Sequence, residues 1–291
     1  MSASAPALPP FFNPHFERVG KALKEFLPAD SPQVVLDAMG YTLLAPSKRV
    51  RGVLVCLAAD LCGNASRALP VACAIEAVHA ASLMLDDLPS MDNAPLRRGR
   101  PSSHTTYGEA VTILAAFALL NQAFAHIAKS YEAAMAQRLT QLLTGAVGLD
   151  GLVGGQAEDV LATERALSFE TLERIHRRKT GMLFSAAAAA GVVTANGSSS
   201  DLAALTAYAK NLGLAFQIVD DLLDVTGTTA ETGKAVRADV RKTTFVSFSG
   251  VDGARELADE LCKTAAAALA PFGDRANALL ELATFVAARR L

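Results

Sequence analysis

Two clusters of aspartate residues lie one in each half of the chain. In the second cluster, FQIVDDLLD, an amide and three carboxylates fall at positions i, i+3, i+4 and i+7: Gln217, Asp220, Asp221 and Asp224. On a helix, side chains with this spacing share one face. Carboxylates stacked on one face repel one another and weaken the helix unless a cation lies beside them. The spacing therefore predicts a site for positive charge.

The first cluster, LDDLPSMD, is less regular. Asp86 and Asp87 end an apolar run, and Asp92 follows six residues after Asp86. Six residues correspond to about 240° on a regular helix, so Asp92 cannot share the face of Asp86 there. Pro89 gives a reason for the helix to bend or end, after which Asp92 can turn back. His79, seven residues before Asp86, is expected on the same face.

The residue types in these clusters indicate a metal and a phosphate. Clustered carboxylates without a cysteine and histidine set favour Mg²⁺, which completes its coordination with water and phosphate oxygens. Arg97, Arg98 and Arg100 follow the first cluster directly. Together these groups suit a diphosphate held between metal ions and guanidinium groups. The alternative is that each Asp-Asp pair is a solvated helix end, but two clusters in apolar helices beside basic residues favour the diphosphate site.

The composition shows what kind of chain carries this site. Of its 291 residues, 51% are hydrophobic and 19% are charged, which excludes a disordered or fibrous chain. A net charge of −2 gives no reason to expect nucleic acid or an anionic membrane surface as a partner. The four cysteines lack metal-binding spacing. They are predicted to be buried free thiols in a cytoplasmic protein.

No segment of the chain is predicted to cross a membrane. The first residues lack the basic and apolar regions of a signal peptide, and residues 1–14 are predicted to form a flexible arm. The most apolar internal runs, Ile113 to Leu120 and Met182 to Val193, are shorter than the roughly 18 to 20 residues of a spanning helix. Both runs are expected to be core helices.

Helices must position the two clusters. Apolar residues recur at helical spacing and alanine is abundant, so the sequence predicts an all-α fold without a sheet. The breaks between apolar stretches have the length of loops, which favours a single domain over residues 1–291. We expect about eleven helices: His15–Phe26, Pro32–Met39, Lys48–Leu61, Leu69–Leu88, Tyr107–Ile127, Glu132–Thr144, Gly155–Ala162, Phe169–Val193, Ser200–Val225, Val251–Ala270 and Asp274–Arg290.

From about Lys48 to Phe245 the chain resembles the trans-prenyl diphosphate synthase family, which includes farnesyl and geranylgeranyl diphosphate synthases. Five motifs carry the resemblance in the family's order: DDLPSMD, LRRGRP, Gly154-Gly155-Gln156, Lys179-Thr180 and FQIVDDLLD. The resemblance implies a single-domain isoprenoid-synthase bundle of ten or more helices around a central cavity. It also implies a homodimer that condenses isopentenyl diphosphate head to tail with an allylic diphosphate, using magnesium.

The resemblance also assigns roles to individual residues. The aspartates would hold three magnesium ions on the allylic diphosphate: Asp86, Asp87, Asp92, Asp220, Asp221 and Asp224. The allylic diphosphate itself would be bound by Arg97, Lys179 and Lys234, and that of isopentenyl diphosphate by Lys48, Arg51, His79 and Arg98. Thr180 and Gln217 would line the developing carbocation. Catalysis would rest on Asp86, Asp87, Lys179, Thr180, Gln217 and Asp220.

The chain departs from the family's motifs in two places. The usual GGKRxRP here is PSKRVRG, which keeps Lys48, Arg49 and Arg51 but loses both glycines and the proline. Asn93 stands where a fourth aspartate is frequent in the family. The first departure affects the expected geometry of the loop and leaves its charges intact.

The chemistry itself makes demands that this sequence can meet. Ionising an allylic diphosphate needs fixed positive charge for the leaving group and a water-free, apolar pocket for the cation. An isoprene unit extends about 5 Å, close to the helix pitch of about 5.4 Å, so side chains one turn before Asp86 could form the floor of the pocket. Ala81 and Ser82 are small there, which favours a geranylgeranyl product over a farnesyl one. Phe117 is a candidate for a deeper floor.

Two other functions fit parts of the pattern. Terpene cyclases share an aspartate motif and a helical fold but generally lack the second motif and the Lys179-Thr180 pair. A non-catalytic subunit that modulates another synthase tends to lose an aspartate motif, whereas both are complete here. The apolar stretch Thr112 to Ala125 could supply the dimer face that the family resemblance implies.

Overall fold

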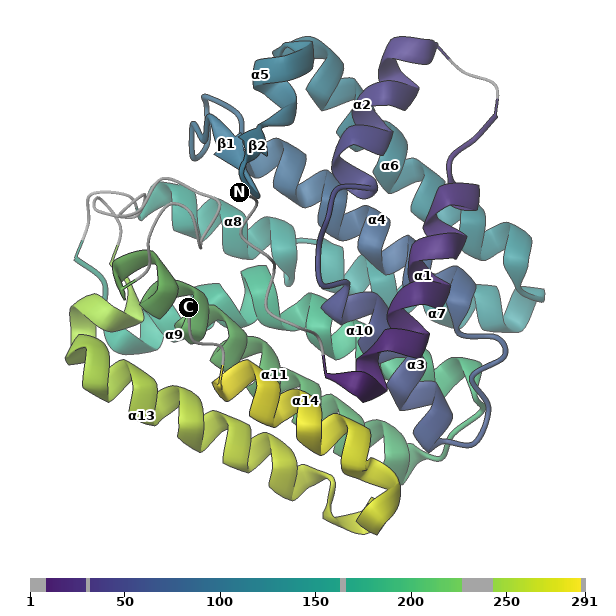
Figure 1. Cartoon of the computed structure of the whole chain (residues 1–291), viewed down its shortest axis with the longest axis vertical. Coiled ribbons are helices and arrows are strands. Elements are labelled where there is room, and N and C mark those ends of the chain that lie inside the picture. Colours follow the sequence, from purple (N-terminus) through teal and green to yellow (C-terminus); the bar gives the residue numbers. More distant parts are fainter. Residues whose placement is uncertain (1–8, 30–31, 163–165, 227–242, 289–291) are drawn as a thin grey trace.

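The computed structural model of this chain describes residues 9–29, 32–162, 166–226 and 243–288. Within these residues the chain folds into one helical bundle, which confirms the predicted all-α class (Figure 1). The main helices are α1 (Asn13–Phe26), α2 (Gln33–Leu43), α3 (Val50–Leu61), α4 (Leu69–Asp86), α5 (Ser103–Tyr107), α6 (Glu109–Ser130), α7 (Ala133–Val147), α8 (Leu152–Leu161), α9 (Phe169–His176), α10 (Met182–Thr194), α11 (Ser199–Thr226), α13 (Phe245–Ala268) and α14 (Asn277–Ala287). Turns of 3-10 helix form η1 (Pro10–Phe12) and η3 (Ala270–Ala276).

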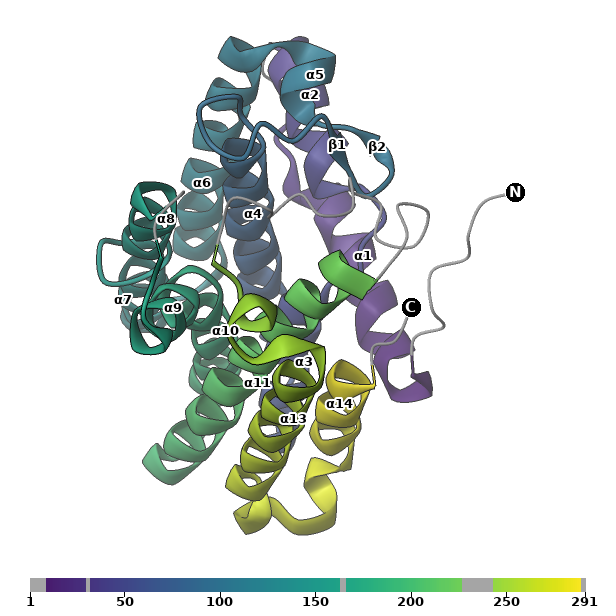
Figure 2. The same ribbon diagram turned by 90° about the vertical axis from the view of Figure 1, so that its left-hand side faces the viewer.

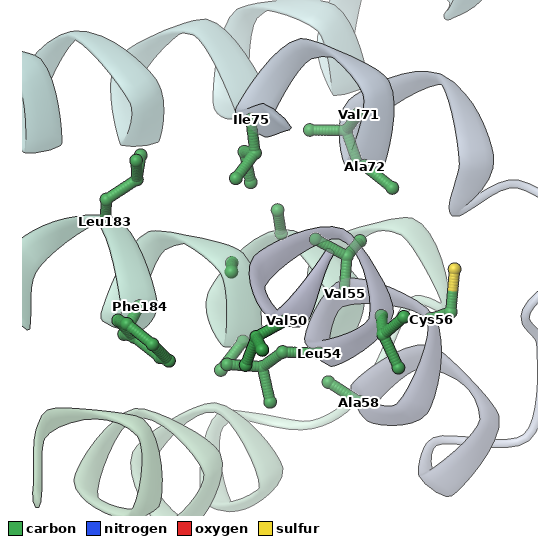
Figure 3. Packing of buried hydrophobic residues seen from close by; sticks show 14 of the residues in the cluster. Val50, Leu54, Val55, Cys56, Ala58, Val71, Ala72, Ile75, Leu183 and Phe184 are labelled. Atoms are coloured by element: carbon green, nitrogen blue, oxygen red, sulfur yellow. The ribbon is translucent and has the colours of Figure 1, made fainter. Parts of the chain in front are cut away.

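Three helices form the centre of the bundle. Apolar side chains of α3, α4 and α10 face one another, among them Val55, Ile75 and Phe184 (Figure 3). At Gly191, α10 approaches α3 so closely that a Cβ atom would lie 2.4 Å from the carbonyl oxygen of Val55. Burial of this apolar surface stabilises the fold by about 25 cal/mol for each Å² removed from water. The close packing fixes the relative positions of the helices that carry the basic motif near Lys48, the first aspartates and the Lys179-Thr180 pair.

The predicted flexible arm of residues 1–14 is corrected in part. Residues 1–8 lie outside the described residues, but Pro10–Phe12 forms a helical turn and α1 follows directly. Phe12 is fully buried, and its ring centroid lies 6.5 Å from that of Phe16. Burial of large aromatic rings anchors the segment to the bundle.

The expectation of a fold without a sheet is wrong, because the described residues contain one small antiparallel hairpin. β1 (Leu96–Arg97) pairs antiparallel with β2 (Arg100–Pro101) around the turn Arg98–Gly99. The turn residues have positive φ angles of 55° and 72°, the feature of a type I′ turn, whose twist matches that of a hairpin. The basic motif LRRGRP therefore folds as a hairpin.

The predicted helix Phe169–Val193 contains an irregular turn. Between α9 and α10 the backbone forms a turn of π-helix, η2 (Arg177–Gly181). Such turns are rare and often mark functional sites. Here the turn carries the Lys179-Thr180 pair, so the irregular backbone coincides with one of the motifs.

α13 begins earlier than the predicted start at Val251. Thr244 and Ser247 form a capping box, in which each side chain accepts a hydrogen bond from the other's backbone N–H group. Gly250 interrupts the helical backbone with a φ of 71°, which explains why helical periodicity was visible only beyond it. The early start places the backbone of Phe245 against α11, as described below.

Three helices, α4, α6 and α11, meet the length and hydropathy of a membrane span, judged by length and composition alone. In the apolar 18-residue stretch of each helix, the share buried inside the protein is 61% in α4, 50% in α11 and 33% in α6. α4 and α11 pack within the bundle, whereas α6 lies along its outer edge (Figure 2). The predicted absence of membrane spans therefore stays a prediction, and the apolar face of α6 needs an explanation of its own.

Candidate functional site

The first aspartate cluster lies where α4 ends. Asp86 is the last residue of α4, and the loop beyond it folds back so that the N–H group of Asp92 donates to the carbonyl oxygen of Asp86 at 2.9 Å. The N–H group of Ala94 donates in the same way to the carbonyl oxygen of Asp87, at 3.1 Å. Asp92 thus returns to the Asp-Asp pair, as the position of Pro89 predicted.

Asp87 is bound by the hairpin. Its carboxylate is almost fully buried, and the Nε atom of Arg97 donates to Oδ1 at 2.9 Å and to Oδ2 at 3.1 Å. The Nη2 atom of Arg97 also binds Oδ1. Both carboxylate oxygens thus accept from one guanidinium group, and the expected metal contact of Asp87 stays a prediction. Its position is that of a residue that orients Arg97.

Asp86 is influenced by charges from several elements, first by Lys179 of the π-turn. Burial raises the pKa of Asp86 to about 6, and the positive charge of Lys179 acts in the opposite direction. The Nζ atom of Lys179 donates to Oδ2 of Asp159 on α8 at 2.7 Å. Sequence reasoning missed Asp159. The signal was available, because Asp159 follows Gln156 by three residues and shares its helix face.

The second glycine of the GGQ motif, Gly155, lets α8 contact the π-turn. A Cβ atom on Gly155 would lie 2.4 Å from the backbone nitrogen of Lys179, a distance that no side chain can occupy. Next to it, Gln156 is buried, with its Nε2 atom 4.0 Å from the sulfur of Met91 in the loop of the first cluster. The motif therefore joins the backbone of Lys179 to the loop that carries Asp92.

In the second cluster, Asp221 points into the protein. It is 3% exposed. Its Oδ1 atom accepts from Nε2 of Gln217 at 2.9 Å, and its Oδ2 atom accepts from the backbone N–H group of Phe245 at 3.1 Å. The Oγ1 atom of Thr180 donates to Oε1 of Gln217, also at 2.9 Å. This network engages both oxygens of Asp221 and fixes the amide of Gln217, and the expected metal contact of Asp221 stays a prediction.

Asp220 and Asp224 lie on the half-buried face of α11. The charge of Asp220 acts on Arg51, whose pKa burial lowers to about 10 while Glu76 and then Asp220 raise it. The guanidinium group of Arg51 lies 4.5 Å from the ring centroid of Phe184. Arg51 therefore extends from α3 over Phe184 of α10, where the charge of the second cluster acts on it.

A second group of cations surrounds His79. The Nη1 atom of Arg51 lies 3.3 Å from Nε2 of His79, and because a guanidinium group can only donate, Nε2 accepts and the ring proton is on Nδ1. Burial and the charge of Arg51 hold the pKa of His79 well below 6.5. Burial and the charge of Arg49 lower the pKa of Arg98 to about 10. Lys48 extends over the ring of Phe285, 5.2 Å from its centroid.

The two aspartate clusters are thus joined by a short series of neighbours. The charge of Lys179 acts on Asp86, and the next residue, Thr180, binds Gln217 on the face of α11 that carries Asp220. Among the described residues, no three aspartate, glutamate, histidine or cysteine side chains lie close enough to enclose a metal ion.

The residues predicted to set product length lie in different surroundings. Ser82 is half-buried on the face of α4 that carries His79 and Asp86, and its Oγ atom donates to the carbonyl oxygen of His79 at 2.9 Å. Ala81 is 4% exposed. The prediction that Phe117 forms a deeper floor is wrong for a single chain, because its side chain is 66% exposed on the outer face of α6. Lys234 lies outside the described residues.

Known proteins of similar sequence and structure include several isoprenoid enzymes. The family model described as Polyprenyl synthetase matches residues 32–266. The chain is 42% identical over 279 residues to a chloroplastic geranylgeranyl pyrophosphate synthase from Capsicum annuum, with 93% of this chain and 76% of the relative covered.

Two solved structures match the fold over nearly the whole chain. One is a FPP/GFPP synthase from Zymomonas mobilis, with 33% identity, a TM-score of 0.84 and coverage of 95% of this chain and 97% of that one. The other is a geranyltransferase from Helicobacter pylori complexed with magnesium and isoprenyl diphosphate, with 30% identity, a TM-score of 0.84 and coverage of 97% and 99%.

Proposed function

This chain belongs to the polyprenyl synthetase family and is a prenyltransferase, and we propose that it condenses isopentenyl diphosphate with an allylic diphosphate to give geranylgeranyl diphosphate. One observation carries this function: the π-turn η2, which packs on α11, connects the two acidic motifs and carries the half-buried Lys179. The charge of Lys179 acts on Asp86, and Arg51 contacts His79 while the charge of Asp220 acts on it. Such a site suits two diphosphates, one at each cationic group.

Four of the six aspartates fit magnesium ligands. Their carboxylates are exposed or half-buried and offer hard oxygen donors: Asp86, Asp92, Asp220 and Asp224. When bound there, magnesium would neutralise the diphosphate as it leaves. Asp87 and Asp221 would act behind these ligands, because their oxygens are held by Arg97, Gln217 and Phe245. The number of three ions remains a prediction from the family resemblance.

Arg97 and Lys179 would receive the negative charge of the leaving allylic diphosphate. Asp87 orients the first and Asp159 the second, so both cations are in place before the bond breaks. Charges fixed in advance stabilise a transition state without reorganising. Thr180 and Gln217 hydrogen-bond each other beside this site, and their oxygens would face the allylic cation.

The diphosphate of isopentenyl diphosphate would lie at Lys48, Arg51 and Arg98. Neutral His79 accepts from Arg51 and so orients its guanidinium group. The isopentenyl double bond would then attack the allylic cation, forming one carbon–carbon bond. The new cation loses a proton to the released diphosphate, which restores a double bond and makes the product allylic.

The small side chains before Asp86 support a twenty-carbon product. Ser82 lies one turn before Asp86 on the same half-buried face, so a larger side chain there would shorten the space for the growing chain. We expect Ser82→Phe and Ala81→Tyr to shift the product towards farnesyl diphosphate. Unchanged product lengths in both variants would remove this argument for geranylgeranyl diphosphate.

The reaction can be tested directly. Purified protein is incubated with magnesium, isopentenyl diphosphate and each allylic primer in turn, and product length is measured by chromatography. The proposal expects geranylgeranyl diphosphate as the main product. A farnesyl product would support the alternative synthase, whereas no turnover with any primer would favour a non-catalytic subunit.

We also propose that the exposed face of α6 binds a second copy of this chain. α6 packs on α4 along one side, while Leu114 and Phe117 on the other side are 58% and 66% exposed. A contiguous apolar face on a helix usually marks an interface. Replacing both residues with glutamate should convert a dimer to a monomer in light-scattering measurements. A wild-type monomer would contradict the proposal.

The cytoplasmic location stays a proposal. It is supported by the four free cysteines, of which Cys56, Cys73 and Cys262 are buried and Cys62 is partly buried. The relative from Capsicum annuum is chloroplastic by name. Fractionation of cells that express the full chain, followed by immunodetection, would locate the protein.

A further inference from the structure

Glu76 is a buried carboxylate in the middle of α4 that the reaction described above does not use. It is 3% exposed. Its Oε1 atom accepts a hydrogen bond from the backbone N–H group of Gly52 at 2.8 Å, and its Oε2 atom lies 3.6 Å from Nη1 of Arg49. Both oxygens therefore face the first turn of α3. Burying a charge costs free energy unless the charge is paired and hydrogen-bonded, as the carboxylate of Glu76 is here.

The backbone next to Glu76 is one that needs support. Arg49 is the residue before α3 and has a left-handed conformation, with φ of 50°. Non-glycine residues adopt this conformation at a cost. The side chain of Arg49 is held on both sides, by Glu76 and by the carbonyl oxygen of Ala45, to which Nη2 donates at 2.9 Å. These contacts stabilise the strained turn between Lys48 and Arg51.

Gly52 explains how the chain accommodates its departure from the usual GGKRxRP motif. A proline at this position would have no N–H group to donate to Glu76. A Cβ atom at Gly52 would also lie 3.0 Å from Cγ of Glu76 and 3.1 Å from Cγ1 of Val19. Glycine therefore permits both the close approach of α4 and the hydrogen bond.

Glu76 is also the counter-ion of a cationic cluster. Arg49 and Arg51 both act electrostatically on Arg98, and the charge of Glu76 raises the pKa of both Arg51 and Arg98, against the effect of burial. His79 in their midst stays neutral. The other acid that acts on Arg51 is Asp220, which belongs to the second aspartate cluster. Without Glu76, three guanidinium groups would repel one another around the same turn.

We propose that Glu76 is a positioning residue for the isopentenyl diphosphate site, acting through Arg49 and the N–H group of Gly52 to hold Lys48 and Arg51 in place. The inference rests on the proposed function, because it assigns these cations to that diphosphate. Removal of a negative charge could instead strengthen anion binding. The geometry decides against this, because both carboxylate oxygens are directed at Arg49 and Gly52.

The test is Glu76→Gln, which keeps the size of the side chain and an acceptor for Gly52 but loses the charge and places an amide N–H group against Arg49. The KM for isopentenyl diphosphate should rise about tenfold, which corresponds to about 1.4 kcal/mol. The KM for the allylic diphosphate and kcat should stay within about twofold of wild type. Glu132→Gln is the matched control, since Glu132 pairs with Arg67 on the surface with its side chain 58% exposed.

A second measurement separates a positioning role from general loss of structure. Arg49→Gln should raise the same KM, and the double variant should be no worse than the poorer single variant, because both changes break one pair. Additive effects, or an unchanged or lowered KM in Glu76→Gln, would overturn the inference. Equal increases in both KM values with a lowered melting temperature would also overturn it.

The activity of the wild type and the kinetics of Glu76→Gln test the proposed function and the role of Glu76 separately. A wild-type protein without condensation activity would remove the proposed function. An active wild type whose Glu76→Gln variant has unaltered kinetics would remove only the role of Glu76.

Discussion

The two aspartate clusters have similar sequences but are built in different ways. The first lies at the end of α4, where a loop and a hairpin fold back over it. The second lies on α11, without a break in the helix. In both, the second aspartate of the Asp-Asp pair is buried and takes a partner inside the protein: Arg97 for Asp87, and Gln217 with the Phe245 backbone for Asp221. The first aspartate of each pair stays on the half-buried side.

The two aspartates of each Asp-Asp pair therefore have different roles. One carboxylate lies on the half-buried side, and its neighbour holds the surrounding structure. The inner partners differ in charge, because Arg97 is itself assigned to the substrate whereas Gln217 is neutral. Loss of the inner aspartate should therefore affect substrate binding in the first cluster and the orientation of an amide in the second.

The largest effect is expected for an outer aspartate. Asp220→Asn should lower kcat about a thousandfold, because a metal-assisted charge interaction in the transition state is lost. The variant should also need a higher magnesium concentration for half-maximal rate. Steady-state kinetics across a magnesium titration would measure both effects. A loss no greater than that of Asp221→Asn would contradict this difference in roles.

A smaller effect is expected for the inner aspartate of the first cluster. Asp87→Asn removes the charged partner of Arg97, and an interaction of this kind is worth about 1.5 to 3 kcal/mol. The KM for the allylic diphosphate should rise about a hundredfold, with little change in the magnesium requirement. Glu132→Gln, which breaks an exposed ion pair with Arg67, is the control and should leave the KM unchanged.

The inner aspartate of the second cluster should matter less. In Asp221→Asn the new amide N–H group would donate to Gln217, whose own amide must then turn round and direct N–H groups at Thr180. The oxygen that the cation needs would face away, so kcat should fall about tenfold at an unchanged magnesium requirement. Equal changes in both inner variants would mean that the charge of the partner is irrelevant.

The smallest effect concerns pH. The pKa of Asp86 in the folded protein is about 6, above its usual value of 3.8, so ionisation of this group destabilises the fold. Its contribution to stability is present at low pH and is lost as the pH rises from about 4 to about 6. Relative to Asp86→Asn, the metal-free wild type should lose about 1 kcal/mol over that range, allowing for its partial exposure.

Thermal unfolding of both proteins in a chelator would measure this pH dependence. Added magnesium and diphosphate should remove the difference near neutral pH, because a cation compensates the buried charge. A constant difference between the two proteins at all pH values would show that the ionisation of Asp86 is not the cause.

Local patterns in the sequence predicted much of this molecule. Helical periodicity located the long helices, and the spacing at Asp220 and Asp224 identified a shared face because such relations lie within one helix. The return of Asp92 could be predicted because Pro89 acts on its own neighbours. For the same reason, the features of the site that depend on adjacent residues were visible without a structure.

Features that depend on distant contacts could not be predicted. The inward direction of Asp221 follows from the position of Phe245, on another helix, and the role of Glu76 follows from its contact with Gly52 on α3. The hairpin at Arg98–Gly99 needs two positive φ angles that a basic sequence does not indicate. Phe117 was misplaced because an apolar side chain on α6 fits an interior and an interface equally well.

The hairpin turns two neighbouring arginines towards different tasks. Arg97 binds Asp87 at the first cluster, while Arg98 lies among the cations near Arg49 and Arg51. Arg97 ends β1, whereas Arg98 begins the turn with a left-handed backbone, so the short hairpin decides which group of residues each charge reaches. A deletion or insertion of one residue here would exchange the sites that the two arginines reach. Substitutions in this stretch should therefore be tolerated more easily than insertions or deletions.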